Sequence, residues 1–169
     1  LQGYYDRDGV PEELYCGLKR KQKKQFKRNK KEYSRLSDHI GFVPLVLVSP
    51  ADSELIRGGS DERRKFLDLV ISQFDKDYLN TLIRYNKALA QRNALLKDEV
   101  TEASLYEIWE EQMSLYGSSI YNSRKAFLQE FTPVFQEFYD YISIGSEEVK
   151  LEYTSDIVQG DLSKQLASV

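Results

Sequence analysis

A stripe of mostly apolar and aromatic side chains constrains the fold of this 169-residue chain more than any other feature. Its members follow one another at steps of three or four residues, which places them on one face of an α-helix. The stripe comprises Leu105, Trp109, Gln112, Tyr116, Ile120, Ser123, Phe127, Phe131, Val134, Phe138 and Tyr141. Because such a face must be buried, another element has to cover it.

A second stripe with the same spacing precedes the first. Its members are Tyr78, Leu82, Tyr85, Leu89, Arg92 and Leu96. Two facing helices joined near residues 97–102 would bury both stripes in an antiparallel pair. The sequence therefore predicts a helical hairpin as the core of this region.

Local signals predict where the long helix begins, bends and ends. Ser104 and Glu107 have the spacing of a capping box at its start. Pro133 predicts a kink, or a division into two helices after Phe131. Gly145 predicts its end.

A helix-start signal lies further upstream. Ser49 suits the cap, Pro50 suits the first turn, and Asp52 can reach back to the cap. This helix is expected to end at residues 58–59, where glycine would supply a left-handed cap. Ser60 is expected to cap the next helix.

The remaining segments predict strands. Residues 1–5 and 14–18 are separated by turn-forming residues and predict two of them. Residues 25–36 fit either a helix or a hairpin with its tip at residues 28–30. Residues 42–48, rich in Val and Leu, predict a strand buried on both faces. Residues 149–153 alternate as a strand does, so the helical part reads as an insertion into a sheet-bearing domain.

Positive charge is concentrated near the start of the chain. Nine of the thirteen residues from 19 to 31 are basic, and none is acidic. Residues 15–35 hold ten bases and one acid, whereas the rest of the chain holds 14 bases and 26 acids. Such a run attracts polyanions, and it predicts either a nucleic-acid contact or a solvated basic loop.

Several function classes are excluded by sequence alone. The chain has no phosphate-binding loop, no dinucleotide-binding glycine motif and no nucleophile elbow. One Cys and one His cannot assemble a Cys/His zinc site. The longest nearly apolar run has seven residues, too few to span a membrane, and a single Cys fits a reducing, cytoplasmic compartment. We therefore expect neither a metal site nor catalysis from this chain alone.

Two stretches carry the strongest family signal: PLVLVSPADSELIRGGSDERRKFLD at residues 44–68 and RYNKALAQRNALLK at residues 84–97. They resemble the RecF family of DNA replication and repair proteins. The resemblance extends more weakly over roughly residues 4–154. Ala51 and Ser53 depart from the family pattern, which usually has a carboxylate and an apolar residue there.

The resemblance implies an α+β (α/β) fold. Residues 1–58 would supply strands and the first helix of a truncated ABC-type ATPase lobe. Residues 59–146 would form an inserted antiparallel helical lobe, and residues 147–169 a returning strand and tail. The start at Leu1 rather than Met suits a central fragment of a longer protein.

The resemblance also implies activities for the full-length family. Its members are SMC-like, weak DNA-dependent ATPases that act in recombinational repair and the SOS response. They bind ATP with Mg²⁺, form ATP-dependent homodimers, bind single-stranded and gapped or duplex DNA, and work with RecR and RecO. Their Walker A motif would precede this region, and their signature and Walker B motifs would follow it.

Candidate site residues follow from the basic run and the resemblance. Ser49 and Asp52 resemble a nucleotide-side or metal-side loop, with the capping box as the alternative. Arg63 and Arg64 match paired arginines that would contact DNA or a partner subunit, with ion pairs on their own helix as the alternative. The candidate DNA-binding residues are Lys19, Arg20, Lys21, Lys23, Lys24, Lys27, Arg28, Lys30, Lys31, Arg63 and Arg64. Two other functions remain open: a stand-alone basic nucleic-acid-binding module and a helical protein-interaction scaffold.

Overall fold

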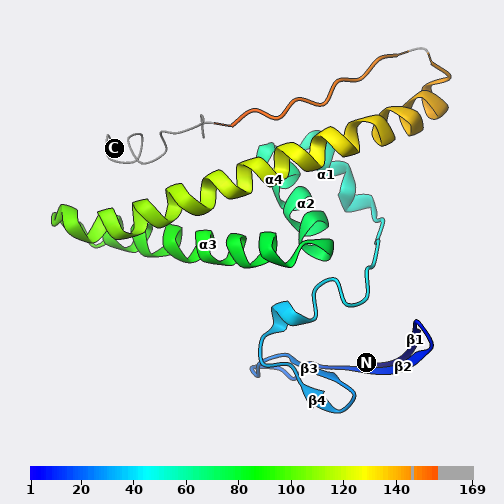
Figure 1. Ribbon diagram of the computed structural model, residues 1–169, viewed down its shortest axis with the longest axis horizontal. Coiled ribbons are helices and arrows are strands. Elements are labelled where there is room, and N and C mark those ends of the chain that lie inside the picture. Colours follow the sequence, from blue (N-terminus) through cyan, green and yellow to red (C-terminus); the bar gives the residue numbers. More distant parts are fainter. Residues whose placement is uncertain (146, 156–169) are drawn as a thin grey trace. The chain divides into compact units, whose positions relative to one another are not determined.

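The computed structural model describes residues 1–145 and 147–155 (Figure 1). It divides into two compact units, Leu1–Asp52 and Ser53–Val169, which are described separately below. The first holds a small antiparallel sheet and the second is helical. The predicted α+β class is therefore confirmed.

Four antiparallel strands in the order β1-β2-β3-β4 make up the sheet of the first unit. They are β1 (Gln2–Arg7), β2 (Val10–Gly17), β3 (Gln25–Arg28) and β4 (Lys31–Glu32). Asp8 and Gly9 have positive φ values of 55° and 80°, as a tight hairpin turn requires. Asn29 and Lys30 form a second such turn, with φ values of 49° and 68°. The hairpin interpretation of the basic run is confirmed, and the helical alternative is wrong.

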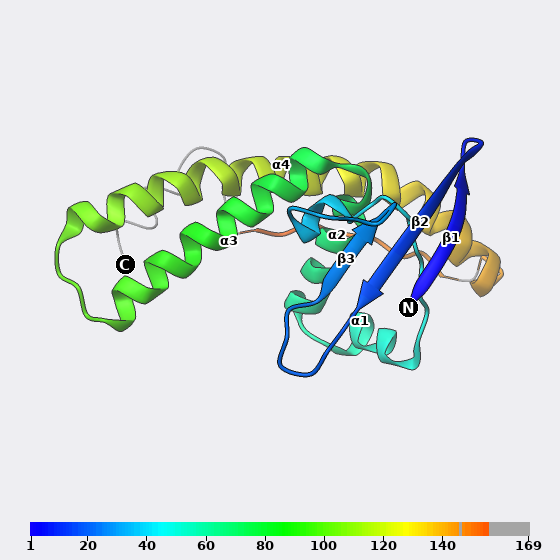
Figure 2. The ribbon, with the colours of Figure 1, turned by 90° about the horizontal axis from the view of Figure 1, so that it is seen from below.

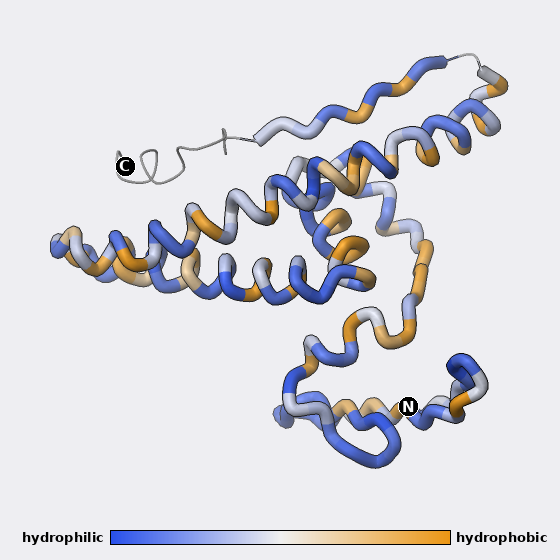
Figure 3. The backbone as a smooth tube through the Cα atoms, viewed as in Figure 1, coloured by the Kyte–Doolittle hydropathy of each residue, from blue (hydrophilic) through white to orange (hydrophobic). Residues whose placement is uncertain are grey.

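The predicted strand at residues 42–48 is absent from the structure. Leu45–Val48 is an irregular segment whose side chains are 71–86% exposed, and it forms part of an orange stretch in Figure 3. A strand buried on both faces needs neighbours that cover it, and the described residues supply none. The prediction of a buried strand at residues 42–48 is therefore wrong for this structure.

Residues 149–153 are also not a strand, because no partner strand pairs with them among the described residues. Their predicted alternation nevertheless persists in burial. Val149, Leu151 and Tyr153 are half-buried, whereas Lys150 and Glu152 are exposed. The Tyr153 ring lies 5.5 Å from that of Tyr121. The rest of the predicted tail, residues 156–169, lies outside the described residues.

The described residues of the second unit form four α-helices. They are α1 (Glu54–Arg57), α2 (Ser60–Phe74), α3 (Lys76–Lys97) and α4 (Ala103–Ser143). Short 3₁₀ turns, η1 (Leu36–Asp38) and η2 (Pro50–Ser53), precede them. The backbone N–H of Ser49 donates to Asp52 Oδ2 at 2.6 Å, so Asp52 reaches back as predicted.

The helix pair α3 and α4 is the antiparallel hairpin predicted from the two stripes (Figure 2). Residues 98–102 join the two helices. A buried cluster holds α2, α3 and α4 together; it consists of Leu67, Ile71, Tyr78 and Ile120. Further side chains pack on this cluster: Leu82, Tyr85, Phe127 and Leu128.

Three details of the helix ends differ from prediction. Helix α4 begins at Ala103, and the Ser104 hydroxyl donates to Glu102 Oε1 at 2.8 Å instead of forming a capping box. Helix α2 already includes Ser60, so Ser60 is not its cap. Helix α4 continues through Pro133, which excludes the predicted division after Phe131, while the alternative kink remains a prediction. The helix ends as predicted beside Gly145, with Ile144 in the left-handed region.

Gly58 is required for a reason other than the predicted left-handed cap. Its φ of −77° is accessible to any residue. A Cβ atom at this position would, however, lie 2.5 Å from the backbone oxygen of Glu54. Glycine is therefore needed because the backbone at Gly58 passes close to the backbone of α1, which it follows.

Replacing Gly58 with alanine is expected to lower the free energy of unfolding by about 1–3 kcal/mol, because backbone must move to admit the methyl group. Chemical denaturation of the two variants measures this. Gly59→Ala is the matched control, since its Cβ would meet nothing within 4 Å and its φ is −76°. Equal stability of the two variants would contradict the steric argument.

Candidate nucleic-acid interface

The basic run lies on the two connections that flank β3. The loop between β2 and β3 carries Lys19, Arg20, Lys21, Lys23 and Lys24, all exposed. The β3–β4 hairpin carries Lys27, Arg28, Lys30 and Lys31. Because β3 has only four residues, its two ends are about 10 Å apart. The structure thus places the nine predicted bases on β3, labelled in Figure 2, and on the connections at its two ends.

Most of this positive charge has no carboxylate partner in the part of the chain that the structure describes. In residues 1–145 and 147–155, only Arg28 among the nine bases forms an ion pair with a carboxylate. Seven of the other eight are exposed, and Lys27 is half-buried. A surface of this kind is available to phosphate groups.

Arg28 is the exception, because its guanidinium group pairs with a carboxylate of the neighbouring strand β2. It pairs with Glu12, whose side chain is only 4% exposed, and its Nε donates to Glu12 Oε2 at 2.8 Å. Asn29 Nδ2 donates to the same oxygen at 2.7 Å. The Arg28 guanidinium also lies 4.1 Å from the ring centroid of Phe42. A DNA contact by Arg28 remains a prediction.

Acidification is expected to loosen this sheet through Glu12. The hydrogen bond from Arg28 holds the pKa of Glu12 below its ordinary value. A carboxylate of this kind contributes stability above its unfolded pKa of about 4.3, and loses it as the pH falls through the lower folded value. Amide hydrogen exchange in β2 and β3, corrected for intrinsic rates, should therefore accelerate in acid. A Glu12→Gln variant should lack this acceleration, and an unchanged profile in the variant would contradict the role of Glu12.

The paired arginines of the second unit have partners in their own unit. Arg63 Nη1 donates to the backbone oxygens of Leu55 at 3.2 Å and Gly58 at 3.1 Å, near the end of α1. Arg64 pairs with Asp61 one turn earlier, as in the predicted alternative. Their proposed contact with DNA or a partner subunit is not tested by this geometry.

The predicted nucleotide-side turn is occupied by its own hydrogen bond. The Asp52 carboxylate accepts from the Ser49 backbone, which is the predicted capping alternative. Within the described ranges, no group of three His, Cys, Asp or Glu side chains is placed to hold a metal ion. A nucleotide contact by Ser49 or Asp52 therefore remains a prediction.

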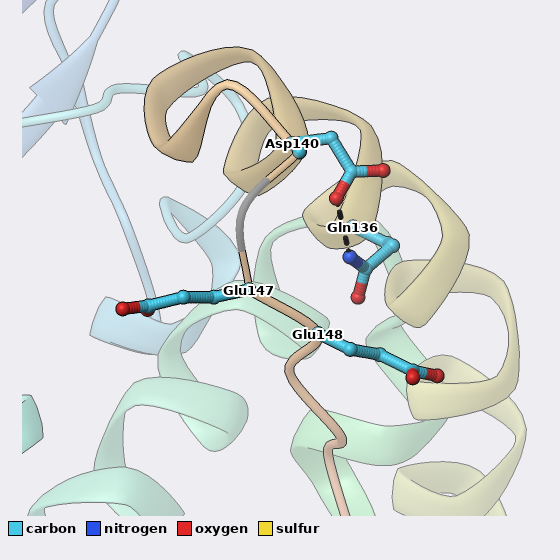
Figure 4. Close-up of a pocket in the computed structure, with 5 residues that line it drawn as sticks. Gln136, Asp140, Glu147 and Glu148 are labelled. Atoms are coloured by element: carbon cyan, nitrogen blue, oxygen red, sulfur yellow. Dashed lines mark hydrogen bonds between the residues drawn. The ribbon is translucent and has the colours of Figure 1, made fainter.

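A hollow at the end of α4 has the wrong charge for nucleic acid. It is lined by Gln136, Asp140, Gly145, Glu147 and Glu148 (Figure 4). Gln136 Nε2 donates to Asp140 at 2.7 Å, while Glu147 and Glu148 point away from each other. Acidic side chains repel phosphate, so the basic surface is the stronger candidate.

Comparison with known proteins gives the chain its family. No protein-family model matches it. It is 62% identical over 168 residues to the DNA replication and repair protein RecF of Bacteroides fragilis, covering 98% of this chain and 45% of that protein. It is 58% identical over 167 residues to RecF of Parabacteroides distasonis, covering 99% and 46%. The chain belongs to the RecF family.

Solved RecF structures agree with this assignment. A structure described as the recombination mediator protein RecF-ATP in the RecFOR pathway matches with a TM-score of 0.83 and 30% identity. The match covers 98% of this chain and 48% of that one. The chain thus spans less than half the length of the RecF proteins it matches. Among its described residues, no helix is long and apolar enough to cross a membrane.

Sequence reasoning missed two tyrosines of the sheet, Tyr4 and Tyr15. Tyr4 is 76% exposed and Tyr15 is 38% exposed. Alternation gives the face of a side chain only within its own strand, so the shared face of Tyr4 and Tyr15 depends on the pairing of Gln2 with Tyr15. Strand register, which the sequence does not give, was needed to show that Lys27 lies on that face too.

Proposed function

We propose that the first unit is a DNA-contacting surface of a RecF protein that acts in DNA replication and recombinational repair. The observation that carries this proposal is the set of eight bases around β3 that have no carboxylate partner within the described residues. Such a surface binds the sugar–phosphate backbone and reads no sequence. The names of the relatives support a role in DNA replication and repair.

The physical basis is the release of counterions from DNA. Each phosphate that a lysine or arginine neutralises frees condensed cations, which favours association at low salt. The ten bases and one acid of residues 15–35 provide this charge, while the acidic remainder of the chain disfavours binding elsewhere. Because the bases are fixed to the sheet, the sheet would set the orientation of the first unit on the DNA.

The activities of the whole protein are part of the proposal. ATP binding is supported by the solved RecF-ATP structure, and Mg²⁺ is proposed from family resemblance alone. Cooperation with RecR and RecO is supported by its description as a mediator in the RecFOR pathway. An ATP-dependent homodimer, a weak ATPase activity, a part in the SOS response and a cytoplasmic location are proposed from family resemblance. Ser49, Asp52, Arg63 and Arg64 are proposed to act only in that larger context.

The chain itself is proposed to bind DNA without hydrolysing ATP. Its sequence has no phosphate-binding loop, so nucleotide chemistry would need residues outside it. Fluorescence anisotropy with labelled duplex DNA tests the proposal. Binding that weakens steeply as salt rises supports it, and absence of binding at low salt would overturn it.

A further inference from the structure

We propose that the open face of the sheet stacks unpaired bases of single-stranded DNA on Tyr15 and Tyr4, beside the basic loop. This inference rests on the proposed DNA-binding function and assigns it a second component. The lysines and arginines would hold the phosphates, and the tyrosine rings would hold the bases. Stacking of this kind tolerates any sequence, because every base has a π-face.

Strand register defines the two faces of the sheet. Tyr15 lies opposite Gln2 on β1 and opposite Lys27 on β3, and directly opposed residues project to the same side. Tyr4, two residues beyond Gln2, shares that side. We call this side the open face.

The other face is covered by the segment that follows the sheet. This other face carries Glu12, Phe26 and Arg28. Arg28 lies opposite Leu14, which is two residues from Glu12, and Phe26 is two residues from Arg28. The guanidinium of Arg28 lies on the ring of Phe42, and the ring of Phe26 lies 5.1 Å from that of His39. The rings of Phe26 and Phe42 are therefore engaged within the first unit, whereas Tyr5, on the same face as Glu12, is 43% exposed.

The Tyr15 ring lies across the backbone of Gly17. A Cβ atom built on Gly17 would lie 2.8 Å from the Tyr15 hydroxyl oxygen and 2.9 Å from its Cε1. Because Gly17 has no side chain, the ring can lie low on the sheet. Lys27 Nζ is 5.7 Å from its centroid, so a cation sits beside the stacking surface.

Charge favours a nucleic acid as the occupant of this face. Gly17 pairs with Gln25 at the end of the sheet, and the five-base loop lies between them. Tyr15 is two residues from that end. Two acids on this face, Glu13 of β2 and Asp6 of β1, lie farther from that end of the sheet than Tyr15 does. A third acid, Glu32 of β4, lies opposite Lys27. A DNA strand that approaches from the side of the loop would meet the cations of the loop first and the tyrosine rings next.

Tyr4 gives the surface a second ring. It is a diagonal neighbour of Tyr15 on adjacent strands, with a Cα separation of about 7–8 Å. Its hydroxyl accepts a hydrogen bond of 2.8 Å from Gln2 Nε2, and Gln2 also donates to Glu13 at 2.6 Å. These bonds orient Tyr4 while leaving most of its ring exposed.

The test compares oligothymidine with duplex DNA of equal length, by fluorescence anisotropy on the full chain. The Tyr15→Leu variant is expected to lose about tenfold in affinity for oligothymidine, as the loss of one base stack predicts, with duplex affinity unchanged. Tyr15→Phe should keep wild-type affinity because it keeps the ring. Tyr5→Leu is the matched control, since the Tyr5 ring lies over Gly3 on the other face.

A second measurement does not depend on variants. Photocrosslinking of the wild-type chain to an oligonucleotide containing 5-iodouracil should label Tyr15 or Tyr4, as mapped by mass spectrometry. Wild-type affinity of Tyr15→Leu for oligothymidine, or crosslinks confined to other residues, would overturn the stacking proposal. Wild-type duplex binding would then leave the proposed function standing, whereas failure of the chain to bind either DNA would overturn both.

Discussion

Replacing Arg124 with methionine is expected to lower the free energy of unfolding of the helical unit by about 2–3 kcal/mol, because it leaves the Asp68 carboxylate, which is only 21% exposed, without its cation. Arg124 Nη2 and Nε donate to Asp68 Oδ1 at 2.7 and 3.0 Å, and Nε also reaches the Tyr78 hydroxyl at 3.1 Å. The three side chains join α2, α3 and α4. Burial, and then the hydrogen bond to Asp68, raises the pKa of Tyr78.

Urea denaturation followed by circular dichroism measures this effect. Arg64→Met is the matched control, because Arg64 also pairs with an aspartate three residues away, but both side chains are largely exposed. Its removal should change stability by no more than about 1 kcal/mol. Similar losses in the two variants would contradict the view that the Arg124 network ties the helices together.

Removing the charge of the basic loop is expected to reduce DNA affinity by about 100-fold or more at low salt, since each lost phosphate contact lowers the counterion release. The variant replaces all five bases with serine: Lys19, Arg20, Lys21, Lys23 and Lys24. None of these five forms an ion pair within residues 1–145 and 147–155, so the fold should persist. Anisotropy titration with labelled duplex DNA gives the affinity.

A matched control removes the same number of exposed bases from the helical unit. Suitable positions are Arg57, Arg84, Lys87, Lys97 and Lys125. The net charge of the two variants is then equal, so a difference in affinity reports the location of the charge. If both variants lose the same affinity, the loop is not a specific DNA surface.

The helical hairpin was predictable because its signals are local. Stripes of side chains at helical spacing located α3 and α4, and the turn at residues 98–102 fell where polar residues interrupt them. For the basic run, the sequence was compatible with both a hairpin and a helix. The sequence could not distinguish the two, because the spacing of Phe26 and Tyr33 fits both helical and strand periodicity.

The errors arose where long-range partners decide the structure. The segment Leu45–Val48 has the composition of a buried strand, yet no neighbour covers it in the described residues. Arg28 looked like one base among nine, because its partner Glu12 lies sixteen residues away.

The most direct test of the central claim is the salt dependence of duplex DNA binding. For the wild-type chain, the logarithm of the association constant should fall linearly with the logarithm of salt concentration, by about 0.9 for each phosphate contacted. The five-serine loop variant should lose about 4–5 from the magnitude of that slope if each base contacts one phosphate. A slope equal to that of the wild type would contradict the assignment of this loop as the DNA-contacting surface.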